Sequence, residues 1–542
     1  MHHLVYPRKT QKLFTNRVTE LEILESYQDR LLHGEPNKLA LLGTRRIGKS
    51  TVLYEFIKRH AANKRLLFVY VNLQRLVMEP LAFAKSYVGL ATKWALRDET
   101  ENFASYEDPE FCMLQLQKRQ AKAAEYLYQF LKSAQSRSAS LKSLLEQALH
   151  FPMVLAEGLK KPIVVMIDEF QEITLLNNFK QLPEILGLLR DVLQTHHRIL
   201  YVFAGSYIRL MQNIIEKPSS PFFGQIQPYY LSAFGKEDAL VLLKKIAQQI
   251  QLEAPKEVEK KMVALTAGHP LYIEALVRAA QEAVMLDGIT LNEETVQRVL
   301  LLQLVNERSP LSFHLRYIYE DALGRARGST ILRGILKALA QDTPLTITAI
   351  AQKMSKQVGL IQAGIAELLK VDLVDRKDKL YFISDPLLRW WMYFKFFHPE
   401  GAFSLKDEIV QELASHFREK YLQVATELGR TKEFELHYFV MRKQGAKVGN
   451  IRLPIFKTVI KNYLLPNGEE IDLFARNDEA WVFELKWKNK LVGMNELHSL
   501  KEKIKVQRYV LISKKGFTPE LLAFARKSPE VVLWGAEVLT ET

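Results

Sequence analysis

The chain contains 542 residues, more than one hydrophobic core usually supports, so its length predicts three or four domains. Hydrophobic residues make up 48% and charged residues 25% of the sequence, which is typical of a globular protein in water. The 75 basic and 61 acidic side chains give a formal net charge of +14. This excess favours polyanionic partners and makes nucleic acid the first candidate.

Three features argue against a membrane or secreted protein. No apolar run is long enough to span a bilayer, and residues 1–10 lack the apolar core of a secretory signal. The single cysteine, Cys112, excludes an internal disulfide framework and a zinc cluster built on several thiolates. We therefore expect a cytoplasmic protein without a membrane partner.

The first motif in the chain lies between residues 14 and 21. Phe14, Asn16 and Arg17 are followed by Glu20 and Leu21, in the pattern Phe-x-Asn-Arg-x-x-Glu-Leu. The segment that follows has the amphipathic spacing of a helix.

Residues 43–50 have the sequence Gly-Thr-Arg-Arg-Ile-Gly-Lys-Ser, the form of a phosphate-binding loop. An apolar run precedes the loop as a buried strand would, and residues 51–60 follow it with helical periodicity. At such a junction backbone N–H groups converge on an anion, and the two glycines let the backbone approach it. Lys49 would reach the outer phosphates and the Ser50 hydroxyl would hold Mg²⁺. We predict an ATP site formed by Gly43, Thr44, Arg45, Arg46, Ile47, Gly48, Lys49, Ser50 and Thr51.

Together, the Phe-x-Asn-Arg-x-x-Glu-Leu segment and the Gly-x-Arg-Arg-x-Gly-Lys-Ser loop resemble the archaeal-type ATPase family within the STAND group of AAA-related ATPases. The resemblance implies that Phe14 and Arg17 lie near the nucleotide base. The paired Arg45 and Arg46 are frequent in this family. These two arginines either grip phosphate or are solvated, and both interpretations stay open.

A long helical region separates the next two predicted strands. Residues 66–73 are rich in valine and aromatic residues and predict a second strand. Residues 79–159 have an almost entirely helical composition and are too numerous for a loop. We predict a helical insertion over the nucleotide site or over an interaction face.

Residues 162–169 combine an apolar strand with two carboxylates. The unbroken apolar run from 163 to 167 is typical of a strand buried on both faces of a parallel sheet. Asp168, at its end, would hold Mg²⁺, and Glu169 would polarise the water that attacks the γ-phosphate. These acids could also begin a helix, which is compatible with the metal role. The pair favours ATP hydrolysis over nucleotide binding alone.

A further apolar strand, residues 199–204, leads to Ser206. The resemblance implies that Ser206 is the polar residue that senses the γ-phosphate. Family members often carry an arginine after the glycine of the next segment, whereas this chain has Gln225 there, so the source of any arginine finger stays open. Residues 229–234 predict the last strand of the sheet.

Amphipathic helices are predicted from residue 236 to residue 299. Within them, the turn Gly268-His269-Pro270 resembles the turn at which STAND ATPases place a helical domain against the nucleotide. His269 could report on the phosphate state, or it could be a capping or packing residue, as a histidine in such a turn often is.

From residue 330 to residue 397 the pattern changes to three short helices and a β-hairpin with a charged turn at residues 376–379. We expect a winged-helix module. Its third helix, predicted at residues 359–369, offers few side chains that read base edges. The module therefore either contacts DNA or packs on the ATPase domain.

The region after residue 407 holds a second set of charged residues. Two neighbouring strands would place Asp472 on one strand and Glu484 and Lys486 on the same face of the other. Two carboxylates and a lysine of this kind can bind a divalent cation and position a water against a phosphodiester. Without that role, the same residues would form only a weakly stabilising ion pair.

The pattern of Asp followed by Glu-x-Lys resembles that of PD-(D/E)XK nucleases, with Ile471 in place of the usual proline. The tail, with predicted strands near residues 509–512 and 531–534 around a helix, resembles the end of restriction-endonuclease-like domains, including the one fused to this ATPase family. An acidic residue from a preceding helix often joins such a site, which implies Glu435, with Glu433 as the alternative. Asp472, Glu484 and Glu435 would then bind Mg²⁺ or Mn²⁺.

We thus expect an α/β protein with four domains. These are a P-loop NTPase domain with a parallel sheet and the helical insertion (residues 1–235), a helical lid (236–325), a winged-helix module (326–400) and a C-terminal α/β restriction-endonuclease-like domain (407–542). In one expected function, the ATPase controls a metal-dependent DNA nuclease on the same chain, in defence or in handling foreign DNA. In the alternative, the chain is a nucleotide-dependent switch or scaffold that binds nucleic acid or a protein partner without cleaving. A homo-oligomer stays open.

Overall fold

The computed structural model divides the chain into two compact units, one built mainly from residues 42–214 and 233–425 and the other mainly from residues 426–542. Within the described residues no helix is both long and apolar enough to cross a lipid bilayer. The described ranges are 7–76, 78–96, 103–136, 140–182, 184–326, 328–398, 436–437, 439–441, 443–449, 451–465, 469–486 and 491–540.

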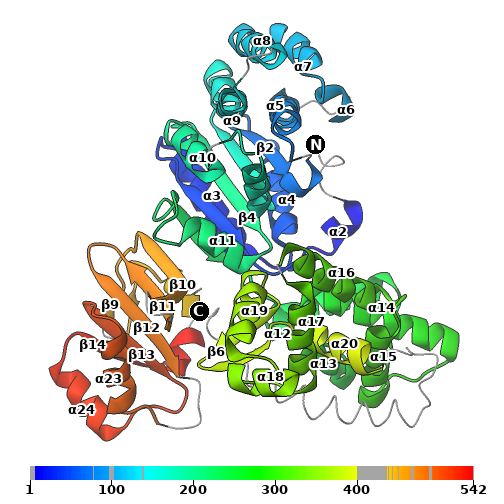
Figure 1. Ribbon diagram of the computed structural model, residues 1–542, viewed down its shortest axis with the longest axis vertical. Coiled ribbons are helices and arrows are strands. Elements are labelled where there is room, and N and C mark those ends of the chain that lie inside the picture. Colours follow the sequence, from blue (N-terminus) through cyan, green and yellow to red (C-terminus); the bar gives the residue numbers. More distant parts are fainter. Residues whose placement is uncertain are drawn as a thin grey trace. The chain divides into compact units, whose positions relative to one another are not determined.

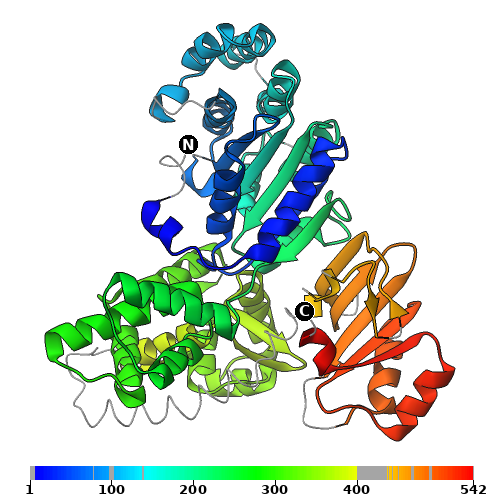
Figure 2. The same cartoon turned by 180° about the vertical axis from the view of Figure 1, so that it is seen from behind.

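A five-stranded parallel sheet carries the phosphate-binding loop, in the strand order β2-β3-β4-β1-β5 (Figure 1). This confirms the predicted α/β class. Blue helix α3 lies over one face of the sheet in Figure 2, and helices α9 and α10 lie over the other face in Figure 1. The strands are β1 (Lys38–Leu42), β2 (Leu67–Asn72), β3 (Ile163–Asp168), β4 (Ile199–Gly205) and β5 (Ile226–Tyr230).

Strand β3 shows why the sequence folds in this way. All six of its residues are buried, as expected of an unbroken apolar run in the middle of a parallel sheet. In the parallel register of β2 and β3, Asn72 pairs with Asp168. The polar ends of both strands therefore lie at the same edge of the sheet, next to the loop that follows β1.

The helices around this sheet include two from the predicted insertion. Helix α5 packs on β2, and α9 packs on α5, β3 and β4. These two helices are therefore part of the layer that covers the sheet, and only α6, α7 and α8 project beyond it (Figure 1). The helices are α2 (Arg8–Lys12), α3 (Val18–Leu32), α4 (Lys49–His60), η1 (Leu73–Arg75), α5 (Pro80–Leu96), α6 (Phe103–Tyr106), α7 (Pro109–Gln117), α8 (Ala121–Gln135), α9 (Leu141–Gly158), η2 (Phe170–Asn178), α10 (Ile185–Gln194) and α11 (Ile208–Ile215).

The segments predicted as a lid and as a winged-helix module share one hydrophobic core, which extends from Ala239 to Phe394. Three helices and a hairpin lie where the sequence predicted them after residue 329. The elements are α12 (Lys236–Gln249), α13 (Lys256–Leu265), α14 (Pro270–Asp287), α15 (Glu293–Val305), α16 (Pro310–Arg325), α17 (Ser329–Gln341), α18 (Ile347–Met354), α19 (Val358–Lys370), β6 (Val374–Lys377), β7 (Leu380–Ile383) and α20 (Pro386–Phe397).

Helix α20 illustrates how this core is assembled. Its first turn is capped by Asp385, whose Oδ1 accepts hydrogen bonds from the backbone N–H groups of Leu387 and Leu388, and Pro386 occupies the first helical position. The other carboxylate oxygen of Asp385 accepts a hydrogen bond from the Tyr272 hydroxyl at 2.5 Å. One acidic side chain thus begins α20 and ties it to α14.

The second unit contains a mixed five-stranded sheet in the order β10-β11-β12-β13-β14. The antiparallel pairing of β11 with β12 confirms the predicted hairpin, and β13 and β14 add to β12 in parallel. Hydrophobic clusters cover both faces of this sheet. The elements are β8 (Lys447–Val448), β9 (Ile451–Arg452), β10 (Thr458–Leu464), β11 (Glu470–Arg476), β12 (Ala480–Lys486), α23 (Met494–Lys503), β13 (Arg508–Ser513), α24 (Pro519–Lys527), β14 (Val531–Gly535) and η4 (Ala536–Thr540).

A pair of alanine substitutions in α19 tests the shared core of the first unit. Leu368 is fully buried, so Leu368→Ala leaves a cavity and should lower the free energy of unfolding by about 2–5 kcal/mol. Leu360, in the same helix, is 44% exposed, and Leu360→Ala should change that free energy by only about 0.5 kcal/mol. Urea unfolding followed by circular dichroism measures both. Equal losses would contradict the packing of α19.

Candidate functional site

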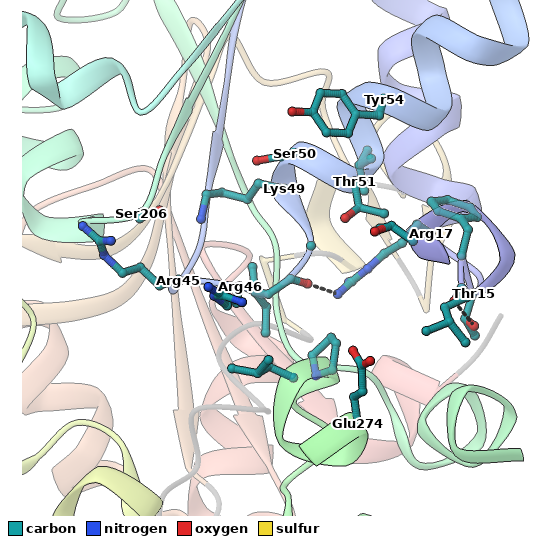
Figure 3. A pocket seen from close by; sticks show the side chains of 18 of the residues that line it. Thr15, Arg17, Arg45, Arg46, Lys49, Ser50, Thr51, Tyr54, Ser206 and Glu274 are labelled. Carbon is teal, nitrogen blue, oxygen red and sulfur yellow. Dashed lines mark hydrogen bonds between the residues drawn. The ribbon is translucent and has the colours of Figure 1, made fainter. Parts of the chain in front are cut away.

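The phosphate-binding loop joins β1 to α4 in the expected strand-to-helix geometry (Figure 3). Gly48 is the residue before α4 and has φ +109°, in the left-handed region that favours glycine. At the other end of the loop, the Gly43 N–H donates to the Gly205 carbonyl at 3.4 Å, which fixes the loop against the end of β4. The first N–H groups of α4 are thereby held facing the cavity described below.

Lys49 is the buried cation of this loop, with only 4% of its surface exposed. Its ammonium group donates to the carbonyls of Gly43 at 2.7 Å and Thr44 at 3.0 Å. Burial lowers the pKa of Lys49, and the carboxylates of Glu169 and Asp168 oppose that shift. The ammonium therefore lies inside the curve of the loop, where a bound phosphate would meet it.

Asp168 is a fully buried carboxyl group at the end of β3. Its Oδ2 accepts hydrogen bonds from the Ser50 hydroxyl at 2.5 Å, the Tyr70 hydroxyl at 2.8 Å and the Asn72 amide at 3.5 Å. Burial, and then the charge of Glu169, raise the pKa of Asp168 above its usual value. A hydroxyl and a carboxylate in direct contact are oxygen ligands of the kind that Mg²⁺ prefers, so Ser50 and Asp168 fit that ion.

Glu169 lies beside Ser206 at the same edge of the sheet. The Glu169 carboxylate accepts hydrogen bonds from the Ser206 hydroxyl and from the Gln171 amide, each at 2.6 Å. Its backbone has φ +53°, which is uncommon for a residue with a side chain. The candidate base and the candidate phosphate sensor are therefore hydrogen-bonded to each other.

The first turn of α11, just after Ser206, is capped by Asp372, which lies in the segment predicted as a winged-helix module. The backbone N–H of Arg209, near the start of α11, lies 3.3 Å from both carboxylate oxygens of Asp372. The Arg209 guanidinium also donates to Asp375, in β6, at 2.7 Å. This segment therefore packs against α11, beside the sheet that carries the phosphate-binding loop, which is one of the two placements that the sequence left open.

A cavity of about 610 Å³ lies over the phosphate-binding loop, which is a common volume for a cofactor site. Asp168 does not itself line the cavity in the described residues, but its carboxylate is hydrogen-bonded to Ser50, which does. Figure 3 shows how several of the lining residues are arranged. The predicted residues that line the cavity are Phe14, Arg17, Arg45, Arg46, Ile47, Gly48, Lys49, Ser50, Thr51, Glu169 and Ser206.

Arg17 supports the loop backbone as well as lining the cavity. Its guanidinium donates to the Ile47 carbonyl at 3.1 Å (Figure 3). It also donates to the Glu20 carboxylate at 3.1 Å. The guanidinium carbon also lies 4.3 Å from the centroid of the Phe234 ring. Arg17 thus connects the Phe-x-Asn-Arg segment to the phosphate-binding loop, a contact that the expected position near the base did not include.

His269 lies behind the loop, and it is absent from the described lining of the cavity. Its Nε2 is 3.3 Å from the Arg45 carbonyl oxygen, and its ring stacks on Tyr272 with 4.1 Å between centroids. Burial lowers the pKa of His269 to about 4, so its imidazole is neutral near pH 7. The geometry is that of the packing residue that the sequence left as an alternative.

Arg45 has acidic and aromatic partners on α16, so it is not simply solvated. Its guanidinium donates to Asp321 at 2.7 Å and to the Tyr317 hydroxyl at 2.9 Å. On the same helix, the Arg325 guanidinium (Nη2) lies 2.9 Å from the Glu172 carboxylate (Oε1). The sequence held no local signal for the contact with Asp321, because 276 residues separate the two partners. Arg46 is exposed and faces the cavity (Figure 3).

Sequence reasoning also missed the tyrosines around Asp168. The Tyr54 hydroxyl, on α4, donates to the Tyr70 hydroxyl at 3.0 Å, and Tyr70 in turn donates to Asp168. Asn72 could have been found, because it is a polar residue at the end of a predicted strand of the same sheet. The two tyrosines looked like ordinary core residues in their apolar segments.

In the second unit, the residues of the proposed nuclease site lie at the open ends of β11 and β12. Leu473 pairs with Phe483, so Asp472 and Glu484 are the next residues on the two strands. The Lys486 ammonium donates to Glu484 Oε1 at 2.7 Å, whereas Asp472 Oδ2 accepts from the Leu485 N–H at 2.6 Å.

The structure describes only some of the metal ligands predicted for the second unit. Glu435 and its alternative Glu433 lie outside the described residues. Within the described part of the chain there is no group of three or more His, Cys, Asp or Glu side chains that could hold a metal ion. Asp472 and Glu484 are therefore two candidate ligands, and the third remains a prediction.

Residues 14–276 match the model of a family described as an ATPase domain predominantly from Archaea. The Walker-type ATPase of Pyrococcus abyssi is 16% identical, covers 70% of this chain and 96% of its own, and has a TM-score of 0.44. The ORC2 protein of Aeropyrum pernix is 16% identical, with 77% and 100% covered and a TM-score of 0.46. The RuvB Holliday junction branch migration motor of Thermotoga maritima is 12% identical, with 71% and 95% covered and a TM-score of 0.33. No curated protein matches the sequence.

Tyr70→Phe tests the role of the tyrosine beside Asp168. Loss of the hydroxyl should raise the pKa of Asp168 further, because that hydrogen bond stabilises the charged carboxylate. The Mg²⁺ concentration for half-maximal ATP turnover should rise by roughly tenfold, the value of a charged hydrogen bond of about 1.5 kcal/mol. The rise should be larger at acidic pH. Tyr54→Phe, which keeps the Tyr70 hydroxyl next to Asp168, is the control. An unchanged Mg²⁺ dependence of Tyr70→Phe would contradict the proposed role of the Tyr70 hydroxyl.

Proposed function

We propose, from the archaeal-type ATPase domain that residues 14–276 form, that this chain binds ATP with Mg²⁺ and hydrolyses the ATP. The observation that carries the proposal is the 2.5 Å contact between Ser50, in the phosphate-binding loop, and Asp168, at the end of β3. A hydroxyl from one motif and a carboxylate from the other meet there as a cation site would require.

The residues of the cavity have separate tasks in this proposal. Lys49 and the first N–H groups of α4 bind the outer phosphates, and Arg46 adds positive charge at the mouth of the cavity. Ser50 and Asp168 hold Mg²⁺, which supplies neutralisation of phosphate charge when it is bound. Glu169 orients and deprotonates the attacking water, and Ser206, hydrogen-bonded to Glu169, contacts the γ-phosphate.

We further propose that the second unit is a metal-dependent DNA nuclease of the restriction-endonuclease-like fold, controlled by the ATPase domain. The support is chemical: Asp472 and Glu484 follow a paired position of two adjacent strands, and Lys486 lies against Glu484. In this proposal Asp472 and Glu484 bind Mg²⁺ or Mn²⁺, with Glu435 as an auxiliary ligand, and Lys486 steadies charge on the phosphodiester. The cellular setting would be defence or the handling of foreign DNA.

One observation favours the alternative, a nucleotide-dependent switch or scaffold without cleavage. The Asp472 carboxylate accepts a 2.6 Å hydrogen bond from the Leu485 N–H, which is a structural use of that side chain. Incubation of the purified protein with plasmid and linear DNA, with and without Mg²⁺, Mn²⁺ and ATP, separates the two functions. DNA cleavage supports the nuclease, whereas ATP-dependent binding of intact DNA supports the switch.

Two substitutions test the ATPase assignment. Lys49→Ala removes a charged contact to phosphate and should weaken ATP binding by about tenfold or more. Glu169→Gln keeps the shape of the side chain without a base, so it should bind ATP normally and hydrolyse it on the order of 10²–10⁴-fold more slowly. Equilibrium binding of a fluorescent ATP analogue and steady-state phosphate release measure the two effects. Normal turnover by Glu169→Gln would refute its role as the base.

Three substitutions in the second unit test the nuclease assignment. Asp472→Ala, Glu484→Ala and Lys486→Ala should each lower DNA cleavage on the order of 10²-fold or more, because each removes a charge from the reacting phosphate or its cation. ATP hydrolysis should stay near the wild-type rate, since the ATP site uses other residues. Lys49→Ala is the reciprocal control for the ATPase assay. Cleavage by Asp472→Ala at the wild-type rate would exclude the nuclease mechanism.

A further inference from the structure

Helix α23 presents a polar stripe to the cavity of the proposed nuclease site. Asn495, Glu496, Ser499 and Lys503 recur at the three- and four-residue spacing that places side chains on one face of a helix. They line a cavity of about 200 Å³ together with Glu484 and Lys486 of β12; Leu500 completes the lining. Asp472 is not part of this lining in the described residues.

The polar groups around this cavity divide into acceptors and donors. Glu484 is only 7% exposed, and its Oε2 has no hydrogen-bond partner among the described residues, whereas its Oε1 accepts from Lys486. The Glu496 carboxylate already has a structural role, because it accepts a hydrogen bond from the Gly493 N–H at 3.0 Å and fixes the start of α23. Lys503, half-buried, and the exposed Ser499 add an ammonium and a hydroxyl from the facing side.

We propose that α23 supplies the phosphate-binding side of this cavity, with Lys503 as the residue that contacts a backbone phosphate of a nucleic acid. Lys486 of β12 and Lys503 of α23 both line the cavity, and the charges of two ammonium groups suit the separated oxygens of one phosphodiester. The unpartnered oxygen of Glu484 is left for a cation next to that phosphate. This inference rests on the proposed nuclease function and names a residue that the Asp and Glu-x-Lys pattern does not contain.

The same helix offers a matched control. Lys501 lies two residues from Lys503 but faces the opposite way: its ammonium group is 3.2 Å from the Glu530 carboxylate and lies over the Tyr509 and Phe524 rings. Removal of either lysine changes the net charge of the protein by the same amount. A difference in nucleic-acid binding between Lys503→Ala and Lys501→Ala therefore reports position and not overall charge.

The experiment measures binding of the full-length chain to a short labelled DNA duplex by fluorescence anisotropy. EDTA keeps the DNA intact, and salt is varied between about 50 and 200 mM. Lys503→Ala should weaken binding severalfold and reduce the slope of log affinity against log salt by about 0.9, the value for one lost phosphate contact. Lys501→Ala should leave both quantities close to wild type, and Lys503→Arg should retain most of the affinity, because it keeps the charge.

The outcomes separate this inference from the nuclease function. Equal affinity and equal salt slope for Lys503→Ala and Lys501→Ala would overturn the phosphate contact, even if the wild-type protein cleaves DNA. A selective loss in Lys503→Ala would support the contact, even if no metal activates cleavage; the cavity would then be a phosphate site without nuclease activity. Circular dichroism confirms that each variant is folded.

Discussion

The proposed ATP site depends on one buried carboxylate, that of Asp168. A charged carboxyl group without compensation costs several kcal/mol in a protein interior, and the hydrogen bonds that other groups donate to Asp168 offset part of that cost. Those donors come from separate elements: Ser50 lies in the first turn of α4, and Tyr70 and Asn72 belong to β2. The requirement to satisfy Asp168 therefore holds the phosphate-binding helix and two strands of the sheet in a fixed arrangement.

A second set of contacts connects this edge of the sheet to the helices that follow it. Arg45 in the phosphate-binding loop pairs with Asp321, and Glu172, just after the acidic pair, pairs with Arg325. Both partners lie on α16, one turn apart, and α16 contributes to the hydrophobic core that continues through α20. The phosphate-binding loop and the segment after β3 thus both contact α16, which also packs into that hydrophobic core.

Sequence patterns predicted local geometry well and distant contacts poorly. The apolar run before Asp168 is typical of a strand buried on both faces, and the glycines around Lys49 indicated a tight loop; the structure has both. The role of α9 was not predicted, because helical composition does not tell a projecting helix from one that covers a sheet. The partner of Arg45 could not be predicted either, because no local sequence pattern connects Arg45 with Asp321, 276 residues away.

The contact between Arg209 and Asp372 couples α11, next to the sheet, to the segment between α19 and β6. Asp372 caps the helix that begins two residues after Ser206, and loss of such a cap costs about 0.5–2 kcal/mol. Any partner that pulled the winged-helix segment away from the core would have to supply that free energy. Linkage is reciprocal, so a ligand that stabilises the capped turn at Ser206 would also favour the docked position of the segment that carries Asp372, with the same coupling free energy in both directions.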